Sequence, residues 1–359
     1  MTLTGASPEQ VRTAIRNRDP FPGTAGFAGE VDGLLVRDVL GRYPLFFERQ
    51  NPTEWRHSPT ELEDPVRLQA GHIHRGTGES EQRFRLPTVE ASLSDADAVA
   101  SVRTALERTL CDVNTDSLAV AFSGGVDSAV LASRFDVPCY TVGFPKSHDI
   151  EAAQSGAALL DVELRVVSLT HESLERAIPE VVSATGRTNT MDVVIALPLF
   201  VLATRVASDG FGSLALGQAA DELFGGYAKV AKAPEDDRLT ADTVRDARRE
   251  TVFSLPGQFE RDVLALCSAG VSPVTPFAHD RVVRAAMSLS GNQLVRGETR
   301  KWALREAVRP WLPDPVVTRK KKALQYGTLA SRELDRLARQ AGYKRRMDNH
   351  VGQYIESLC

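Results

Sequence analysis

Cysteine is scarce in this chain of 359 residues: its four cysteines lie far apart, and none forms a Cys-x-x-Cys pair. This spacing gives no sign of a zinc knuckle or a disulfide framework, and it favours a reducing, cytoplasmic setting. The N-terminus has no charged leader followed by an apolar stretch, so no secretory signal is visible. The richest apolar run, Val193–Val206, is short for a bilayer span and is interrupted by Pro198 and Arg205. We therefore expect no membrane partner.

A dominant charge sign is also absent, because 43 Lys and Arg stand against 47 Asp and Glu, for a formal net charge of −4. This balance argues against a broad surface for duplex nucleic acid. Charged residues make up 25% and hydrophobic residues 42% of the chain, which is the usage of a soluble globular protein. The length corresponds to about two ordinary domains, so a sizeable core can form without disulfides or metals.

The hydrophobic pattern changes near residue 93. Over residues 1–92, short apolar runs between Gly, Pro, Asn and Thr predict strands and turns, with a hairpin in which Leu34–Val39 and Pro44–Arg49 flank Gly41. We expect a small β-rich region over these residues. The remainder, 93–359, is expected to form one domain, with its core in residues 93–230 and a helical part in residues 231–359.

Strand-like and helix-like segments alternate through this core, which predicts an α/β fold with a parallel sheet. The predicted strands are Leu118–Phe122, Cys139–Phe144, Glu163–Leu169 and Ser213–Leu216. The predicted helices between them are Val126–Phe135, Ile150–Leu160 and one that Thr170 caps and that runs toward Val182. Beyond Lys232 the chain is charge-rich and helical with no clear strand. Ligands of such sheets bind at the carboxyl ends of the strands, so the loops there are candidate site segments.

The first of these loops, Ser123–Ser128, reads Ser-Gly-Gly-Val-Asp-Ser and opens a predicted helix. Two glycines permit a tight turn that brings backbone N–H groups close to an anion, and the helix N-terminus adds partial positive charge. Ser123 and Ser128 add hydroxyl donors, and Asp127 can hold a divalent cation. No Lys follows the glycines, which excludes a Walker-type loop. A glycine turn with serine caps is the structural alternative.

This loop resembles the pyrophosphate loop (PP-loop) of the ATP pyrophosphatases, which split ATP between the α- and β-phosphates and adenylate a substrate. Further segments resemble the asparagine synthetases in order and spacing: residues 149–154, Leu216–Tyr227, Lys301–Arg305, and Leu312-Pro313 with Arg319–Lys321. The resemblance covers about residues 95–330. It implies a parallel-sheet core of the adenine-nucleotide alpha-hydrolase-like (HUP) type, with ATP and Mg²⁺ as cofactors.

The resemblance also implies roles for single residues. Asp127 and Asp221 would share Mg²⁺ bridging the phosphates, and Lys321, twenty residues beyond Lys301, would contact the reacting phosphate. The implied nucleotide-binding residues are Ala121, Ser123, Gly124, Gly125, Asp127, Ser128, Val142, Gly143 and Gly217. For Val142 core packing is the alternative, and in isolation Arg319–Lys322 would be a solvated face or a nucleic-acid patch.

Gln218 stands where asparagine synthetases usually have Glu, a candidate base for the attack of ammonia. Glutamine cannot take a proton, although it can orient ammonia by hydrogen bonding. Leu216 likewise stands where a Ser is common. Gln218 therefore remains a candidate catalytic residue, while aspartate as the substrate is placed in doubt.

The N-terminal region resembles part of the class II glutamine amidotransferase domains: Leu35–Phe47 is similar to their Arg-Asp-x-x-Gly-x-x-Pro-Leu segment, and Gly71-His72 to a later Pro-Gly-His. Those domains use an N-terminal Cys as nucleophile, but position 2 is Thr here. Only some thirty-five residues precede the Arg-Asp segment. We interpret residues 1–92 as a shortened, inactive relic that serves as a structural cap.

The sequence thus predicts an AMP-forming ligase that adenylates a carboxylate, by default aspartate, and passes the acyl group to ammonia or an amine. One alternative keeps the loop and changes the acceptor to a tRNA nucleoside, a peptide or a biosynthetic carboxylate. A second is a non-catalytic nucleotide sensor. The oligomeric state is left open, with a homodimer as one alternative.

Overall fold

The computed structural model describes residues 3–76, 78–232, 243–319 and 327–359. The chain divides into two compact units, each assembled from separate stretches of sequence. The first unit comprises residues 1–113, 217–260 and 275–311, and the second unit comprises residues 114–216, 261–274 and 312–359. The predicted boundary between residues 92 and 93 lies inside the first unit, and the division into 1–92 and 93–359 stays a prediction.

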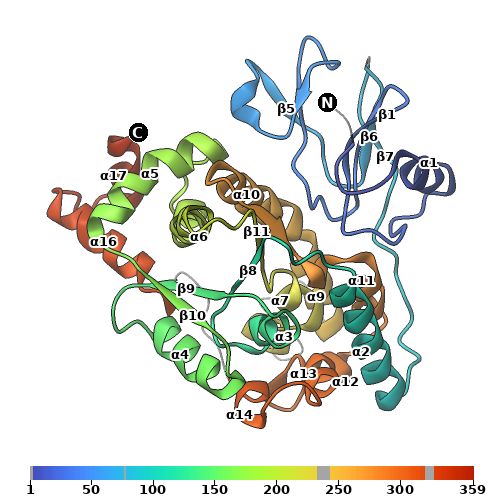
Figure 1. The fold of residues 1–359 in the computed structure, drawn as a ribbon. Coiled ribbons are helices and arrows are strands. Elements are labelled where there is room, and N and C mark those ends of the chain that lie inside the picture. Colours follow the sequence, from blue (N-terminus) through green and yellow to red (C-terminus); the bar gives the residue numbers. More distant parts are fainter. Residues whose placement is uncertain (1–2, 77, 233–242, 320–326) are drawn as a thin grey trace. The chain divides into compact units, whose positions relative to one another are not determined.

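The second unit contains a five-stranded parallel sheet with the strand order β10-β9-β8-β11-β12 (Figure 1). Its strands are β8 (Leu118–Ala121), β9 (Cys139–Gly143), β10 (Leu164–Ser168), β11 (Ser213–Ala215) and β12 (Ser272–Val274). Every residue of β9 is buried, as are the first three of β8. Continuous burial is typical of parallel strands that are covered on both faces. The predicted α/β class with a parallel sheet is confirmed.

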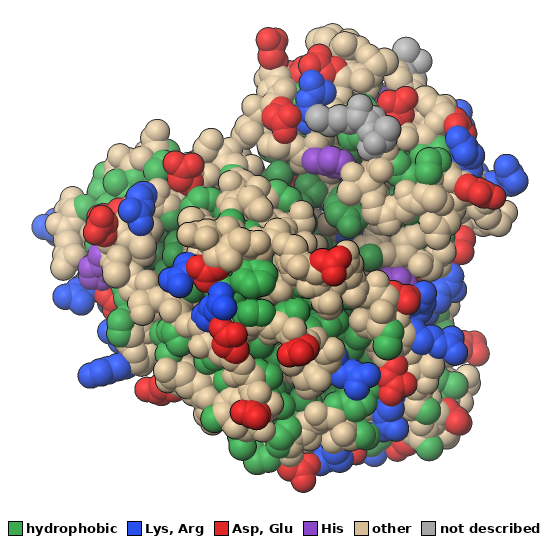
Figure 2. Space-filling model, in the orientation of Figure 1, with side chains coloured by type: hydrophobic (Ala, Val, Ile, Leu, Met, Phe, Trp, Pro, Cys, Tyr) green, Lys and Arg blue, Asp and Glu red, His purple; other side chains and the backbone are tan. Residues whose placement is uncertain are grey.

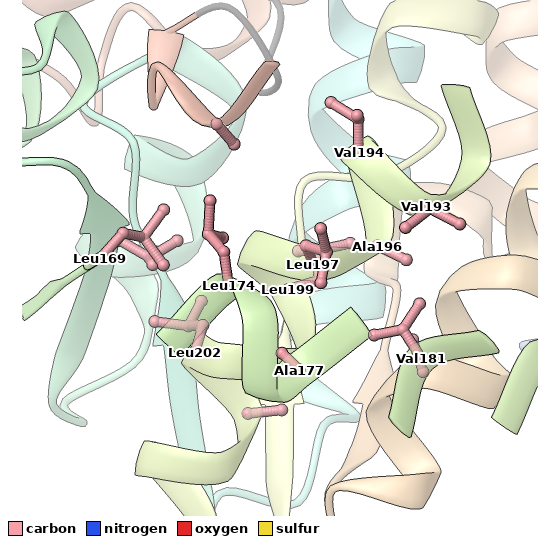
Figure 3. Close-up of a cluster of buried hydrophobic side chains, with 14 of the residues drawn as sticks. Leu169, Leu174, Ala177, Val181, Val193, Val194, Ala196, Leu197, Leu199 and Leu202 are labelled. Atoms are coloured by element: carbon pink, nitrogen blue, oxygen red, sulfur yellow. The ribbon is translucent and has the colours of Figure 1, made fainter. Parts of the chain in front are cut away.

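The helices of the second unit lie between and after these strands. They are α3 (Val126–Arg134), α4 (His148–Leu160), α5 (His171–Thr185), α6 (Thr190–Ser208), α14 (Asp314–Val317), α16 (Ala330–Gln340) and α17 (His350–Leu358). Thr170 caps α5 as predicted. Its side chain accepts the backbone N–H of Ser173, and the Ser173 side chain accepts the backbone N–H of Thr170. Leu174 of α5 and Leu197 of α6 belong to one buried cluster (Figure 3). Burying each such leucine stabilises the fold by about 1.5–3 kcal/mol.

Helix α6 has 19 residues and extends beyond the apolar run Val193–Val206 at both ends. By length and composition alone it is long and apolar enough to cross a membrane, which the sequence analysis did not expect. Half of its apolar window is buried inside the protein. A helix that is apolar on all sides is also what the centre of a large core requires.

Strands do occur beyond Lys232, and the expectation of none was wrong. Strand β12 lies at the end of the five-stranded sheet, and β13 (Val295–Arg296) pairs with β14 (Thr299–Arg300) in the first unit. β12 has only three residues, of which one is Pro273. A strand this short shows no alternation of apolar and polar residues in the sequence. Proline is tolerated there because β12 is an edge strand.

The N-terminal part of the first unit is β-rich, as predicted. One antiparallel sheet has the order β1-β2-β6-β7 and another the order β4-β3-β5. The strands are β1 (Ala28–Val31), β2 (Leu34–Arg37), β3 (Phe46–Glu48), β4 (Trp55–Arg56), β5 (Pro65–Arg67), β6 (His72–His74) and β7 (Glu81–Gln82). The predicted hairpin around Gly41 was wrong, because β2 pairs with β1 across Asp32-Gly33. Both turn residues have positive φ, the geometry that an Asp-Gly hairpin turn favours.

The described helices of the first unit are α1 (Pro8–Asn17), α2 (Asp95–Cys111), α7 (Ala220–Phe224), α8 (Ala228–Lys232), α9 (Val244–Phe253), α11 (Asp280–Met287), α12 (Gly291–Leu294) and α13 (Trp302–Val308). Helix α10 (Leu255–Ser268) continues into the second unit, and short 3-10 helices span Pro59–Glu61 and Pro276–Ala278.

The sequence analysis missed helix α1. This helix starts at a capping box of Ser7 and Gln10, and buries only Val11 and Ala14. Because so few of its positions are apolar, the sequence shows little of the apolar repeat by which an amphipathic helix is predicted.

A buried ion-pair network ties the N-terminal region to the rest of the first unit. The guanidinium of Arg42 donates to Asp38 and to Asp280, with both N to O distances 2.8 Å. All three side chains are almost fully buried. Because Asp280 begins α11, residues far apart in the sequence are fixed together, which is consistent with a structural role for residues 1–92.

Candidate active site

The loop Ser123–Ser128 connects β8 to α3 and is ordered by its own side chains. The Ser128 hydroxyl accepts the N–H of Ser123 at 3.1 Å and donates to the carbonyl of Gly125 at 3.1 Å. Gly124 has φ +70°, and a Cβ added there would lie 2.2 Å from the carbonyl oxygen of Ala152. The turn therefore requires glycine for two reasons, its backbone conformation and its contact with α4.

Arg319 holds this loop against α4, a role that sequence reasoning missed. Its Nη1 donates to the carbonyls of Ala152 at 2.6 Å and Gly124 at 3.2 Å, and its Nη2 donates to the Ser155 hydroxyl at 2.9 Å. Gly156 completes the contact, since a Cβ there would lie 3.1 Å from Gly124 Cα. Arg319 is more than 160 residues from its partners in sequence, so only the fold shows the contact.

Gly124→Ala should destabilise the protein by about 2–4 kcal/mol, because the new Cβ meets backbone and the residue stays at positive φ. Gly210→Ala is the matched control in the same unit, since Gly210 has φ +92° with nothing within 4 Å of an added Cβ. The control should lose only the conformational cost, about 1–2 kcal/mol. Thermal unfolding measures both. Equal losses of stability in the two variants would contradict the close packing of the loop on α4.

The end of β9 lies at the same edge of the sheet as the loop. β8 and β9 are parallel neighbours with Ala121 opposite Tyr140, so both strands end at this edge. Val142 is buried and Ala121 is partly exposed. A Cβ on Gly143 would lie 2.4 Å from Ser147 Oγ, which shows how closely the chain turns back after β9. The structure therefore places Val142 and Gly143, which the resemblance implies bind the nucleotide, at the same edge of the sheet as the PP-loop.

In the first unit, Asp221 pairs with a lysine that sequence reasoning did not connect to it. Asp221 lies in the first turn of α7, and its Oδ1 is 2.6 Å from Nζ of Lys301. The Asp221 side chain is 39% exposed, whereas that of Lys301 is 6% exposed. Lys301 has φ +56° and immediately precedes α13. The lysine thus fixes a carboxylate that still faces solvent.

The paired glycines after α7 make room for this ion pair. The N–H of Gly226 donates to the backbone carbonyl of Asp221 at 2.7 Å. A Cβ on Gly226 would lie 1.8 Å from Asp221 Oδ1 and 2.4 Å from Cε of Lys301. Gly226 therefore cannot carry a side chain unless the ion pair moves.

Glu222, beside Asp221 in the sequence, has a structural role. It is buried, and burial raises the pKa of its carboxyl group. Its Oε1 accepts the Tyr227 hydroxyl at 2.5 Å, and its backbone carbonyl accepts the Thr251 hydroxyl at 3.1 Å. Gln218 is partly buried just before the left-handed residue Ala219, which has φ +72°. The two adjacent acids of α7 thus differ, since only Asp221 is available to a ligand.

The predicted site residues fall into three groups. Those in the second unit are Ala121, Ser123, Gly124, Gly125, Asp127, Ser128, Val142 and Gly143, and those in the first unit are Gly217, Gln218 and Asp221. Asp127 is buried in the first turn of α3. Lys321 lies outside the described residues.

A family model described as asparagine synthase matches residues 101–266 and 253–351, more than half of the chain. The chain belongs to the asparagine synthase family. The match includes the PP-loop, the segment around Asp221 and the basic run at Arg319. The resemblance that these segments carry in the sequence is thereby confirmed.

Three asparagine synthetases named as glutamine-hydrolysing illustrate the similarity. A protein of Methanocaldococcus jannaschii is 26% identical over 282 residues, with 68% of this chain and 51% of that protein covered. Asparagine synthetase 3 of Arabidopsis thaliana is 24% identical, with 82% and 56% covered. Asparagine synthetase B of Escherichia coli is 25% identical, with 58% and 41% covered. This member of the asparagine synthase family spans about half the length of the curated relatives it matches.

Among solved structures, the NMN synthetase of Francisella tularensis is similar at 11% identity with a TM-score of 0.32. The alignment covers 74% of this chain and 93% of that one. A likeness this slight carries no argument about the site. The family assignment rests on the sequence match.

Proposed function

We propose that this asparagine synthase family member is an ATP pyrophosphatase that adenylates a carboxylate and transfers the acyl group to ammonia or an amine. The observation that carries the proposal is the PP-loop Ser123–Ser128 at the carboxyl end of β8, where the turn at Gly124 opens α3. Backbone N–H groups and a helix N-terminus at this edge of a parallel sheet favour a bound polyphosphate.

The proposed reaction has two steps. A carboxylate oxygen attacks the α-phosphorus of ATP, the bond to the β-phosphate oxygen breaks, and pyrophosphate leaves with its electron pair. The nitrogen nucleophile then attacks the acyl carbon, AMP leaves, and the nitrogen releases a proton as the amide forms. Lys321 would stabilise the charge that develops on the phosphate, and Gln218 would orient the nucleophile.

Mg²⁺ fits the donor set that this chain offers. Asp127 and Asp221 would each offer a carboxylate, and Mg²⁺ is commonly bound by one or two carboxylates together with phosphate oxygens. When bound, the ion would neutralise part of the triphosphate charge. Lys301 would act on the protein side, because its ammonium holds the Asp221 carboxylate in place.

The family resemblance does not fix which substrate this protein adenylates. Aspartate is the default carboxylate, but Gln218 and Leu216 differ from the residues usual in asparagine synthetases. A peptide, a tRNA nucleoside or another carboxylate would use the same ATP chemistry. Acidic and basic side chains are interspersed over the face seen in Figure 2, which does not favour an extended nucleic-acid surface.

Product analysis tests the proposal. With ATP, Mg²⁺ and a carboxylate panel that includes aspartate, the purified protein should form AMP and amide from ammonium salts. Glutamine alone should release no glutamate, because residues 1–92, which resemble part of the glutaminase domains, contain no Cys to act as nucleophile. Release of ADP in place of AMP would contradict the proposed reaction. Glutamate formation would contradict the interpretation of residues 1–92 as an inactive relic.

A further inference from the structure

The first unit contains a cavity of about 580 Å³ beside α9, and its described lining residues include none of the predicted site residues. Three arginines of α9 line it: Arg245, Arg248 and Arg249. Asp246 is the acidic residue among the described lining residues. Its carboxylate accepts the Thr243 hydroxyl at 2.6 Å, at the N-cap of the helix. Among the described lining residues, three positive charges therefore face this cavity against one negative charge, which already accepts the hydroxyl of the N-cap residue Thr243.

Arg248 is the most deeply buried of the three, with 1% of its surface exposed. Its Nη1 donates to the carbonyl of Ala286 at 3.0 Å, while its buried Nε has no hydrogen-bond partner in the described part of the chain. Burial, together with the charges of Arg245 and Arg249, lowers the pKa of Arg248 to about 10. No described residue pairs Arg248 with a carboxylate, and burying a cation without an anionic partner is costly, so an anion bound here would stabilise the site.

The two neighbouring arginines do not supply that counter-charge, and they have neutral partners themselves. Arg245 donates to the carbonyl of Val89. Arg249 donates to the carbonyls of Pro87 at 3.0 Å and Leu86 at 2.8 Å. Backbone carbonyls hold the guanidinium groups in position without neutralising them. Among the described residues, α9 thus presents three guanidinium groups to the cavity without a carboxylate paired to them.

We propose that this cavity binds a small oxyanion, a phosphate or a carboxylate, through Arg248. A guanidinium presents its N–H groups in a planar fork that matches the oxygens of either group, and the unpartnered Nε–H is a donor of this fork. The volume accommodates an anion with a small organic body, and Val89 and Met287 add apolar contact. This site goes beyond the proposed function, since none of the residues assigned to the ATP pyrophosphatase reaction is among its described lining residues.

Equilibrium dialysis of the full chain against ³²P-labelled inorganic phosphate at constant ionic strength tests the site. Arg248→Met should lose one bound phosphate per chain relative to the unaltered protein, while its affinity for ATP stays the same. Arg12→Met is the matched control, because Arg12 is half-exposed and pairs with Asp32 at 2.8 Å. This control should bind phosphate as the unaltered protein does. An unchanged number of bound phosphates in Arg248→Met would overturn the proposal.

Arg248→Lys keeps the charge and tests the fork separately, even if Arg248→Met does not fold. Its phosphate affinity should fall by about tenfold, because an ammonium replaces two parallel donors by a point charge. Unchanged affinity in Arg248→Lys would also overturn the proposal. Competition experiments on the unaltered protein distinguish a carboxylate ligand from a phosphate ligand. Displacement of labelled phosphate by acetate indicates a carboxylate ligand, and displacement by glycerol phosphate alone indicates a phosphate ester.

Discussion

Asp127→Asn and Asp221→Asn are each expected to lower the rate of AMP formation by about 10³-fold or more, with the fold retained. Asparagine has the size of aspartate but carries no charge, so each change removes one of the two carboxylates proposed to bind Mg²⁺ and leaves packing almost intact. The measurement is AMP release at saturating ATP and Mg²⁺, with circular dichroism as the check of folding. Asp32→Asn is the control, because Asp32 is exposed and forms an ion pair with the half-exposed Arg12.

Asp221→Asn should also have a small effect on stability. Asp221→Asn removes the ion pair with Lys301, which is partly exposed and stabilises the protein by about 1 kcal/mol or less. Lys301→Met should lower AMP formation less than Asp221→Asn does, because it frees the carboxylate without removing it. Normal turnover in Asp127→Asn or Asp221→Asn would contradict the assignment of these residues to the metal.

Lys321→Ala is expected to lower the rate of AMP formation by about 10²–10³-fold, the loss typical of one preorganised donor in a reaction that develops charge. ATP affinity should change much less, since the PP-loop and Mg²⁺ would hold most of the phosphate charge. Lys321→Arg should not restore the full rate, because a planar fork does not replace a compact ammonium at one oxygen. Single-turnover kinetics separates the rate from the affinity.

The flanking lysines provide the controls for this prediction. Lys320→Ala and Lys322→Ala should have small effects on AMP formation. If the run Arg319–Lys322 were instead a solvated basic patch, all three alanine variants would show small, similar and salt-sensitive effects. Equal behaviour of the three lysines would therefore refute the role of Lys321.

The parallel core was predictable from the sequence because its signals are local. β8 and β9 are short apolar runs, each followed by a helix with a visible start, and Thr170 has the side chain that an N-cap needs. The Asp32-Gly33 turn is also a local signal, but the hairpin was predicted around Gly41 because the apolar runs that flank Gly41 are longer. β12 gives no such signal, since its pairing with β11 depends on the sheet being present.

The supports of the candidate site were not predictable, because their partners are distant in sequence. Arg319 contacts carbonyls of Gly124 and Ala152, and Lys301 contacts a carboxylate eighty residues earlier. In the sequence, both look like ordinary surface cations in charge-rich segments. The same holds for Arg248, whose burial follows only from the packing of α9. The family resemblance therefore pointed to the PP-loop and Asp221 as candidates, whereas the contacts that hold them required the fold.

Isotope exchange between labelled pyrophosphate and ATP tests the central claim most directly. Formation of an acyl adenylate is reversible, so labelled pyrophosphate should enter ATP when a carboxylate substrate and Mg²⁺ are present, with no nitrogen donor required. The exchange should depend on the carboxylate, and Asp127→Asn should abolish it. ATP binding without exchange, across a carboxylate panel that includes aspartate, would contradict the account and favour a nucleotide sensor.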